Sequence, residues 1–177
     1  LGDVYKRQLL MWAWLRHRGH SAVACAAGGL AWAFNGAFIT WLSAPMPTVA
    51  LWLPLILLGV DRSVDRGHPR DVALLATAIG LSLLGAYVPT SLAVLTAAAV
   101  YAAGLVAGLG HGRHADRSVA CAVVSPSNAI LRLAIGAVTG VALAAVALLP
   151  MLANLVASPA RTRTMNEATL PWANLAT

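Results

Sequence analysis

The chain has 177 residues, of which 59% are hydrophobic and only 10% are charged, and its formal net charge is +6. A water-soluble domain of this length needs a more charged surface, so the composition predicts a membrane protein and excludes an ordinary soluble enzyme. The positive charge does not indicate a nucleic-acid partner, because the arginines stand in short segments between apolar runs. The lipid bilayer is the expected partner.

The first eight residues are expected to be foreign to the natural polypeptide. Leu1–Gln8 (LGDVYKRQ) resembles the translation of a transposase adaptor used to prepare sequencing libraries, and it contains the only lysine of the chain, Lys6. We therefore exclude residues 1–8 from the predicted fold. Residues 9–177 are expected to form a single transmembrane domain that is a fragment of a longer protein.

The apolar runs predict an all-α fold, a polytopic bundle of about five transmembrane helices after a truncated one at residues 9–15. Spans are expected near residues 21–43, 48–60, 72–87, 90–108 and 130–156. The first is long enough to cross a hydrocarbon core of about 30 Å at about 1.5 Å per residue. The run at 48–60 is short and contains Pro54, so it either crosses as a kinked helix or enters and leaves on the same side.

The loops between these spans predict an orientation. If five spans alternate, the loops at 16–20, 61–71 and 109–128 lie on one side, and the tail at 158–177 lies on the other. The first side then holds Arg16, Arg18, Arg62, Arg66, Arg70, Arg113, Arg117 and Arg132. Arginine-rich loops stay in the cytoplasm, so the tail is expected to face outward from a bacterial plasma membrane.

Polar residues inside the spans are few. No Asp, Glu, Lys, Arg or His is expected in the middle of a span, which argues against a proton-coupled pump. The side chain of Asn35 is polar and lies inside an apolar run, so it is expected to form a hydrogen bond with another helix or with a substrate. The spacings Gly136-xxx-Gly140 and Gly104-xxx-Gly108 predict close helix packing, within the bundle in preference to between two chains.

Two histidine pairs, His17/His20 and His111/His114, have a spacing at which a helix would bring their imidazoles together. These pairs could bind a metal ion or could simply lie in basic loops exposed to water. Each pair supplies too few ligands for a complete metal site, which favours the loops, so no metal is predicted.

The outward tail carries the candidate binding residues. Arg161 and Arg163 are the two arginines on the side that is otherwise poor in them, and a guanidinium suits a lipid phosphate. Glu167, Asn154 and Tyr87 are possible polar contacts on the same face. The alternative is a solvated tail that touches anionic head groups.

Several short segments resemble the YfhO-type family of bacterial polytopic membrane proteins, which is related to GT-C glycosyltransferases. These segments are Gly29–Trp41, Trp52–Leu55 running into Asp61-Arg62, Gly85 before Pro89, and Leu148–Pro150 leading to Ser158 and Arg161. One departure is Ala86–Thr90, where the family pattern has a His-Pro-Gln-like turn.

The resemblance implies transfer of a sugar from a polyprenyl-phosphate carrier to a cell-envelope acceptor. It places the catalytic acids in a first outward loop that these residues do not include, so the catalytic residues and any cofactor are unknown. A transporter or flippase of lipid-linked saccharides and a non-catalytic membrane scaffold are the alternatives.

Overall fold

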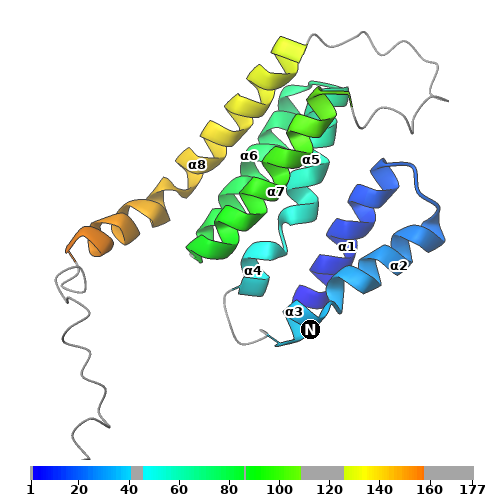
Figure 1. The fold of residues 1–177 in the computed structure, drawn as a ribbon, viewed down its shortest axis with the longest axis horizontal. Coiled ribbons are helices and arrows are strands. Elements are labelled where there is room, and N and C mark those ends of the chain that lie inside the picture. Colours follow the sequence, from blue (N-terminus) through cyan, green and yellow to red (C-terminus); the bar gives the residue numbers. More distant parts are fainter. Residues whose placement is uncertain (1, 41–45, 86, 109–125, 158–177) are drawn as a thin grey trace, which may run out of the picture.

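The computed structural model describes residues 2–40, 46–85, 87–108 and 126–157, and every regular element in these ranges is an α-helix (Figure 1). The predicted all-α class is therefore confirmed for the described part of the chain. The helices are α1 (Gly2–His17), α2 (Ala22–Ala33), α3 (Gly36–Thr40), α4 (Met46–Ala50), α5 (Leu53–Asp65), α6 (Pro69–Leu84), α7 (Val88–Val106) and α8 (Pro126–Ala157).

Three stretches are long and apolar enough to cross a membrane. They are Met46–Asp65 with 20 residues, Val88–Val106 with 19 and Ser127–Met151 with 25. Helix α6 has 16 residues and covers about 24 Å, which is less than the usual hydrocarbon thickness of about 30 Å. The prediction of helices long and apolar enough to cross a membrane is thus confirmed for these three stretches, whereas the count of five spans stays a prediction.

The predicted continuous helix over 21–43 is wrong, because the chain breaks at Asn35. Helix α2 ends at Ala33, and Phe34 donates its backbone N–H to the carbonyl of Leu30. The Oδ1 atom of Asn35 then accepts a hydrogen bond from the backbone N–H of Phe38 at 3.2 Å, which starts α3. Asparagine favours such capping positions over helix interiors, so a polar residue in an apolar run ended one helix and began another. The end of this predicted span, 41–43, lies outside the described residues.

The predicted charged loop at 61–71 is also wrong. Helix α5 continues to Asp65 and α6 begins at Pro69, which leaves a turn of only three residues around Gly67, whose φ is +65°. Val60 and Val64, one helical turn apart, are both buried in the core and hold this charged segment in the helix. A proline is well tolerated in the first turn of a helix, so Pro69 begins α6 where a loop was expected.

Other boundaries shift by a few residues. The run at 48–60 is interrupted and consists of α4 and α5, with Pro54 in the first turn of α5; whether it crosses the membrane or returns to the same side stays a prediction. Helix α6 begins before the predicted 72, and α7 already begins at Val88. Helix α8 begins at Pro126, so its first turn includes 127 and 128, which were expected to lie in a loop. Helix α1 covers the expected remnant at 9–15 and extends to Gly2 on one side and His17 on the other.

The core lies between α5, α6 and α7 and the start of α8, and glycines bring these helices close together. A Cβ added at Gly59 of α5 would lie 2.9 Å from the Cα of Leu75 in α6. At Gly140 of α8 it would lie 2.8 Å from the carbonyl oxygen of Ala76. Gly136 and Gly140 thus pack against neighbouring helices within the bundle, as predicted. A Cβ added at Gly104, in contrast, would have no atom of a neighbouring element within 4 Å.

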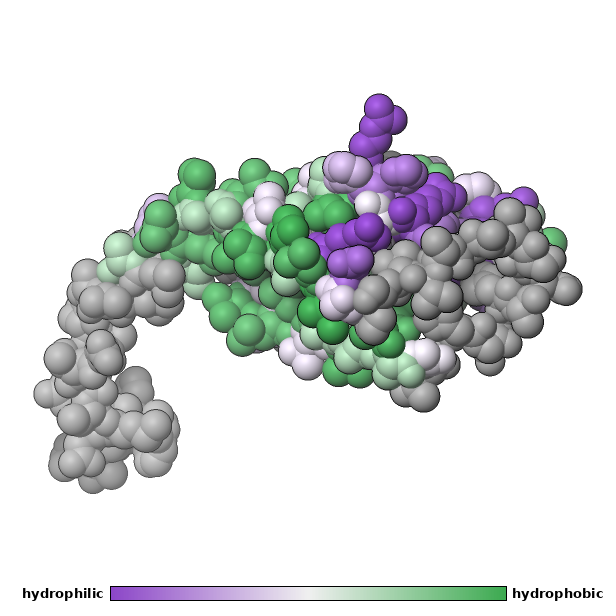
Figure 2. All heavy atoms as spheres, turned by 90° about the horizontal axis from the view of Figure 1, so that it is seen from above, coloured by the Kyte–Doolittle hydropathy of each residue, from purple (hydrophilic) through white to green (hydrophobic). Residues whose placement is uncertain are grey.

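The outer faces of α7 and α8 are apolar and exposed. Side chains such as Val138 and Val146 of α8 are 70% and 82% exposed. Figure 1 shows that α1 and α5 end, and α6 and α8 begin, at the same end of the bundle, and the sequence places six arginines at these helix ends. This basic end holds Arg16, Arg18, Arg62, Arg66, Arg70 and Arg132. Figure 2, which looks onto that end, shows hydrophilic side chains gathered there beside the apolar surface.

Six of the eight arginines predicted to share one side therefore lie at one end of the bundle. Arg113 and Arg117 lie outside the described residues. The assignment of this end to the cytoplasm stays a prediction.

Candidate functional site at the basic end

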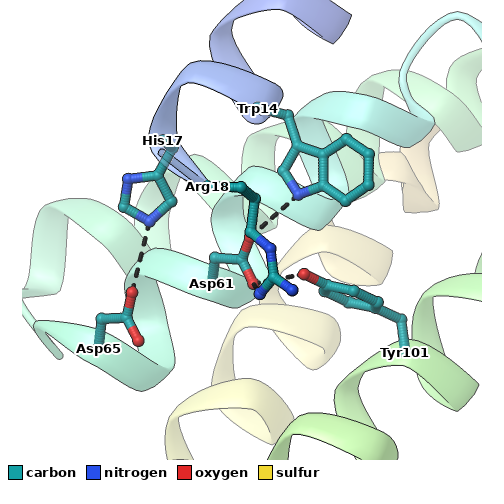
Figure 3. Close-up of polar contacts among 6 residues, drawn as sticks. All are labelled: Trp14, His17, Arg18, Asp61, Asp65 and Tyr101. Carbon is teal, nitrogen blue, oxygen red and sulfur yellow. Dashed lines mark hydrogen bonds and ion pairs between the residues drawn. The ribbon is translucent and has the colours of Figure 1, made fainter. Parts of the chain in front are cut away.

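The most strongly buried charged side chain at the basic end is Asp61 of α5, which is only 2% exposed. Its Oδ2 atom accepts a hydrogen bond from Nε1 of Trp14 at 2.9 Å, and its Oδ1 atom accepts one from the hydroxyl of Tyr101 at 2.7 Å. The guanidinium of Arg18 lies 3.6 Å from Oδ1. Figure 3 shows these side chains converging from α1, α5 and α7 and from the residue that follows α1.

A contact between a histidine and a carboxylate lies beside this cluster. His17 Nε2 is 3.4 Å from Oδ2 of Asp65, and the carboxylate of Asp65 is half exposed. Asp61 and Asp65 stand one turn apart on α5, and the residues at 14, 17 and 18 come from the last turn of α1 and the turn after it. Side chains three or four positions apart project from one face of a helix, so the ends of α1 and α5 meet through complementary groups.

Aromatic contacts close the space around the carboxylate. The rings of Trp14 and Tyr101 lie edge to face, with centroids 6.0 Å apart and an interplanar angle of 74°. The guanidinium of Arg18 lies 5.9 Å from the centroid of the Tyr101 ring. Such edge-to-face and cation–π arrangements are favourable, and here they also keep water from the carboxylate. A buried carboxylate is tolerated only with partners of this kind.

This arrangement is suited to joining helices. Both carboxylate oxygens of Asp61 accept hydrogen bonds from protein donors, and the side chain is only 2% exposed, so the carboxylate is engaged within the protein. Within the described ranges there is no group of three or more His, Cys, Asp or Glu side chains that could hold a metal ion. We conclude that the Asp61 cluster, formed by Trp14, Arg18, Asp61 and Tyr101, fixes α1 and α7 against α5.

Most residues predicted to bind a ligand fall in the tail. Arg161, Arg163 and Glu167 lie outside the described residues, and so does the side chain of Asn154. Tyr87 directly precedes α7, at the opposite end of that helix from the Asp61 cluster, and its carbonyl accepts a hydrogen bond from the hydroxyl of Ser91 at 3.1 Å. The structure therefore brings Tyr87 together with none of the other predicted site residues among those it describes.

The histidine pairs have different outcomes. His17 contacts Asp65, and the carbonyl of His20 accepts a hydrogen bond from Arg16. His111 and His114 lie outside the described residues.

The sequence pattern missed the Asp61 cluster, although part of its signal was present. Val60 and Val64 continue the helical period of α5 through the charged residues, which identifies Asp61 as helical. The partners of Asp61 are 47 and 40 positions away in the sequence, at Trp14 and Tyr101. No local pattern connects residues at that separation.

Comparisons with known proteins add no relative. No family model, no curated protein and no solved structure matches the chain. The function is therefore argued from the residues, their geometry and the resemblance described above.

Proposed function

We propose that this chain is part of a multi-pass protein of the bacterial plasma membrane that transfers a sugar from a polyprenyl-phosphate carrier, as GT-C glycosyltransferases do. The observation that carries the proposal is the combination of three membrane-length helices with arginines gathered at one end. The resemblance to YfhO-type proteins supplies the reaction. In this proposal the described helices are the membrane scaffold of the enzyme.

The proposed orientation separates the two ends of the bundle by function. With the basic end in the cytoplasm, Tyr87 and the tail that carries Arg161 and Arg163 lie on the outer face. Polyprenyl-phosphate-linked sugars present their phosphate at such an interface, and the forked donors of arginine suit it. The Asp61 cluster then has a structural role at the opposite end.

Transfer of labelled sugar tests this function directly. Membranes from cells that express the complete gene are incubated with radiolabelled polyprenyl-phosphate sugars, and label in the cell-envelope acceptor is counted. We expect transfer that falls by about tenfold or more when Arg161 and Arg163 are both changed to Gln, because charge-assisted contacts are lost. The matched control is Arg117→Gln, from the arginine-rich side, which should leave transfer unchanged. Well-folded protein in the membrane with no transfer from any such donor would refute the proposal.

A transporter or flippase of lipid-linked saccharides is the second candidate. It is favoured by one observation, a buried carboxylate at Asp61 within a membrane-length stretch, since ionisable groups in such places often belong to transport pathways. Movement of a fluorescent lipid-linked saccharide across proteoliposomes, without any sugar transfer, is the result that favours this candidate. A scaffold without chemistry gives neither transfer nor movement.

A further inference from the structure

A second feature of the basic end is the packing of Arg132 against the turn between α5 and α6. Gly67 occupies this turn with a φ of +65°, and a Cβ added there would overlap the guanidinium of Arg132 from α8. The side chain of Arg132 is therefore held across the turn and does not extend freely into solvent. Glycine is required at position 67 for two reasons: its positive φ disfavours other residues, and any side chain would collide with the guanidinium of Arg132.

Two arginine donors at this turn are buried without an acceptor. Within the described part of the chain, NH1 of Arg132 and Nε of Arg62 have no hydrogen-bond partner. Arg62 belongs to the same turn, because its carbonyl accepts the backbone N–H of Gly67 at 3.3 Å. An unsatisfied buried donor on a cationic group is costly, and native proteins nearly always supply such a group with an acceptor. The two donors thus lack an acceptor of the kind that an oxygen-rich anion supplies.

The surrounding charges also favour an anion. Arg66 and Arg70 flank the turn and are exposed. Of the described acids at this end, Asp61 and Asp65 are already paired with residues at the end of α1. Asp71, in the first turn of α6, is the remaining described acid at this end. Its single negative charge faces the four positive charges of Arg62, Arg66, Arg70 and Arg132.

The apolar surroundings distinguish a lipid from a soluble ion. Arg132 lies in the second turn of the membrane-length stretch Ser127–Met151, which places it near the level of lipid head groups if α8 spans. Ile130 and Leu131, in the adjoining part of α8, are 55% and 58% exposed, so an apolar surface for acyl chains lies within one helical turn of Arg132. We propose that Arg132 and Arg62, at the α5–α6 turn, bind the phosphate group of an anionic phospholipid. This site lies at the opposite end of the bundle from Arg161 and Arg163 in the proposed topology and does not depend on sugar transfer.

Lipid retention in native mass spectrometry tests the site. The full chain, purified in a mild detergent, is titrated with phosphatidylglycerol and, separately, with phosphatidylcholine of the same acyl chains. We expect one tightly held phosphatidylglycerol and weaker binding of phosphatidylcholine. Arg132→Gln and Arg62→Gln should each weaken phosphatidylglycerol binding by about tenfold or more, because each removes a charge-assisted hydrogen bond.

The matched control is Arg16→Gln, which removes the same charge from the same end of the bundle but leaves the turn intact. Arg132→Lys keeps the charge and loses the forked donors, so it should weaken binding less than Arg132→Gln, and it provides a second variant if the glutamine variant does not fold. An equal, small loss in the three glutamine variants, with none in Arg132→Lys, would mean diffuse attraction of lipid by charge and would overturn the site. Displacement of the lipid by millimolar inorganic phosphate would overturn the lipid as its source, and absence of any retained phosphatidylglycerol would overturn the proposal entirely.

Discussion

Removal of the Asp61 carboxylate tests how much the buried cluster contributes to the fold. In Asp61→Ala, Trp14 and Tyr101 lose their acceptor, and Arg18 loses its counter-ion. A hydrogen bond to a charged group contributes about 1.5–3 kcal/mol, and breaking a buried ion pair from one side costs about 3–5 kcal/mol. Since these contributions overlap, we expect a loss of about 3–5 kcal/mol in the free energy of unfolding.

The assay is reversible unfolding in mixed micelles with increasing mole fraction of sodium dodecyl sulfate, followed by circular dichroism. Asp65→Ala is the matched control, because it removes the same group from the same helix at a half-exposed position, where an ion pair contributes about 0–1 kcal/mol. Tyr101→Phe should cost about half as much as Asp61→Ala, since it removes one of the two hydrogen bonds. Equal effects of Asp61→Ala and Asp65→Ala would refute the reasoning that the buried carboxylate joins the helices.

Three further predictions concern packing, topology and the helix break. Gly140→Ala should destabilise the protein by about 1–3 kcal/mol in the same unfolding assay because its methyl group meets α6, whereas Gly104→Ala should be neutral or stabilising by up to about 1 kcal/mol. In a background without native cysteines, His68→Cys should react with an impermeant maleimide only after cells are opened, and Val88→Cys should react in intact cells; the reverse pattern would contradict the proposed orientation. Asn35→Ala should cost about 1 kcal/mol through loss of the cap on α3, and a gain in stability would instead favour one continuous helix.

The hydropathy pattern predicted α7 and α8 well because each is a long apolar run. It failed at Asn35 and at Asp61–Asp65 for opposite reasons. At Asn35 a single side chain, which accepts a backbone N–H, ended a run that is apolar on average. At Asp61–Asp65 the buried Val60 and Val64 kept a charged segment helical, because tertiary packing outweighs a local preference for loop.

By itself the sequence predicted an α-helical protein with membrane-length apolar helices and with Arg16, Arg18, Arg62, Arg66, Arg70 and Arg132 at one end, because hydropathy and charge act on each segment independently. The candidate ligand residues of the tail stay predictions, since they lie outside the described residues. Tertiary structure alone decided which glycines bring helices together and which groups satisfy Asp61. The hydrogen bonds of Asp61 join residues 40 or more positions apart. Their formation depends on how the helices pack, which no single segment encodes.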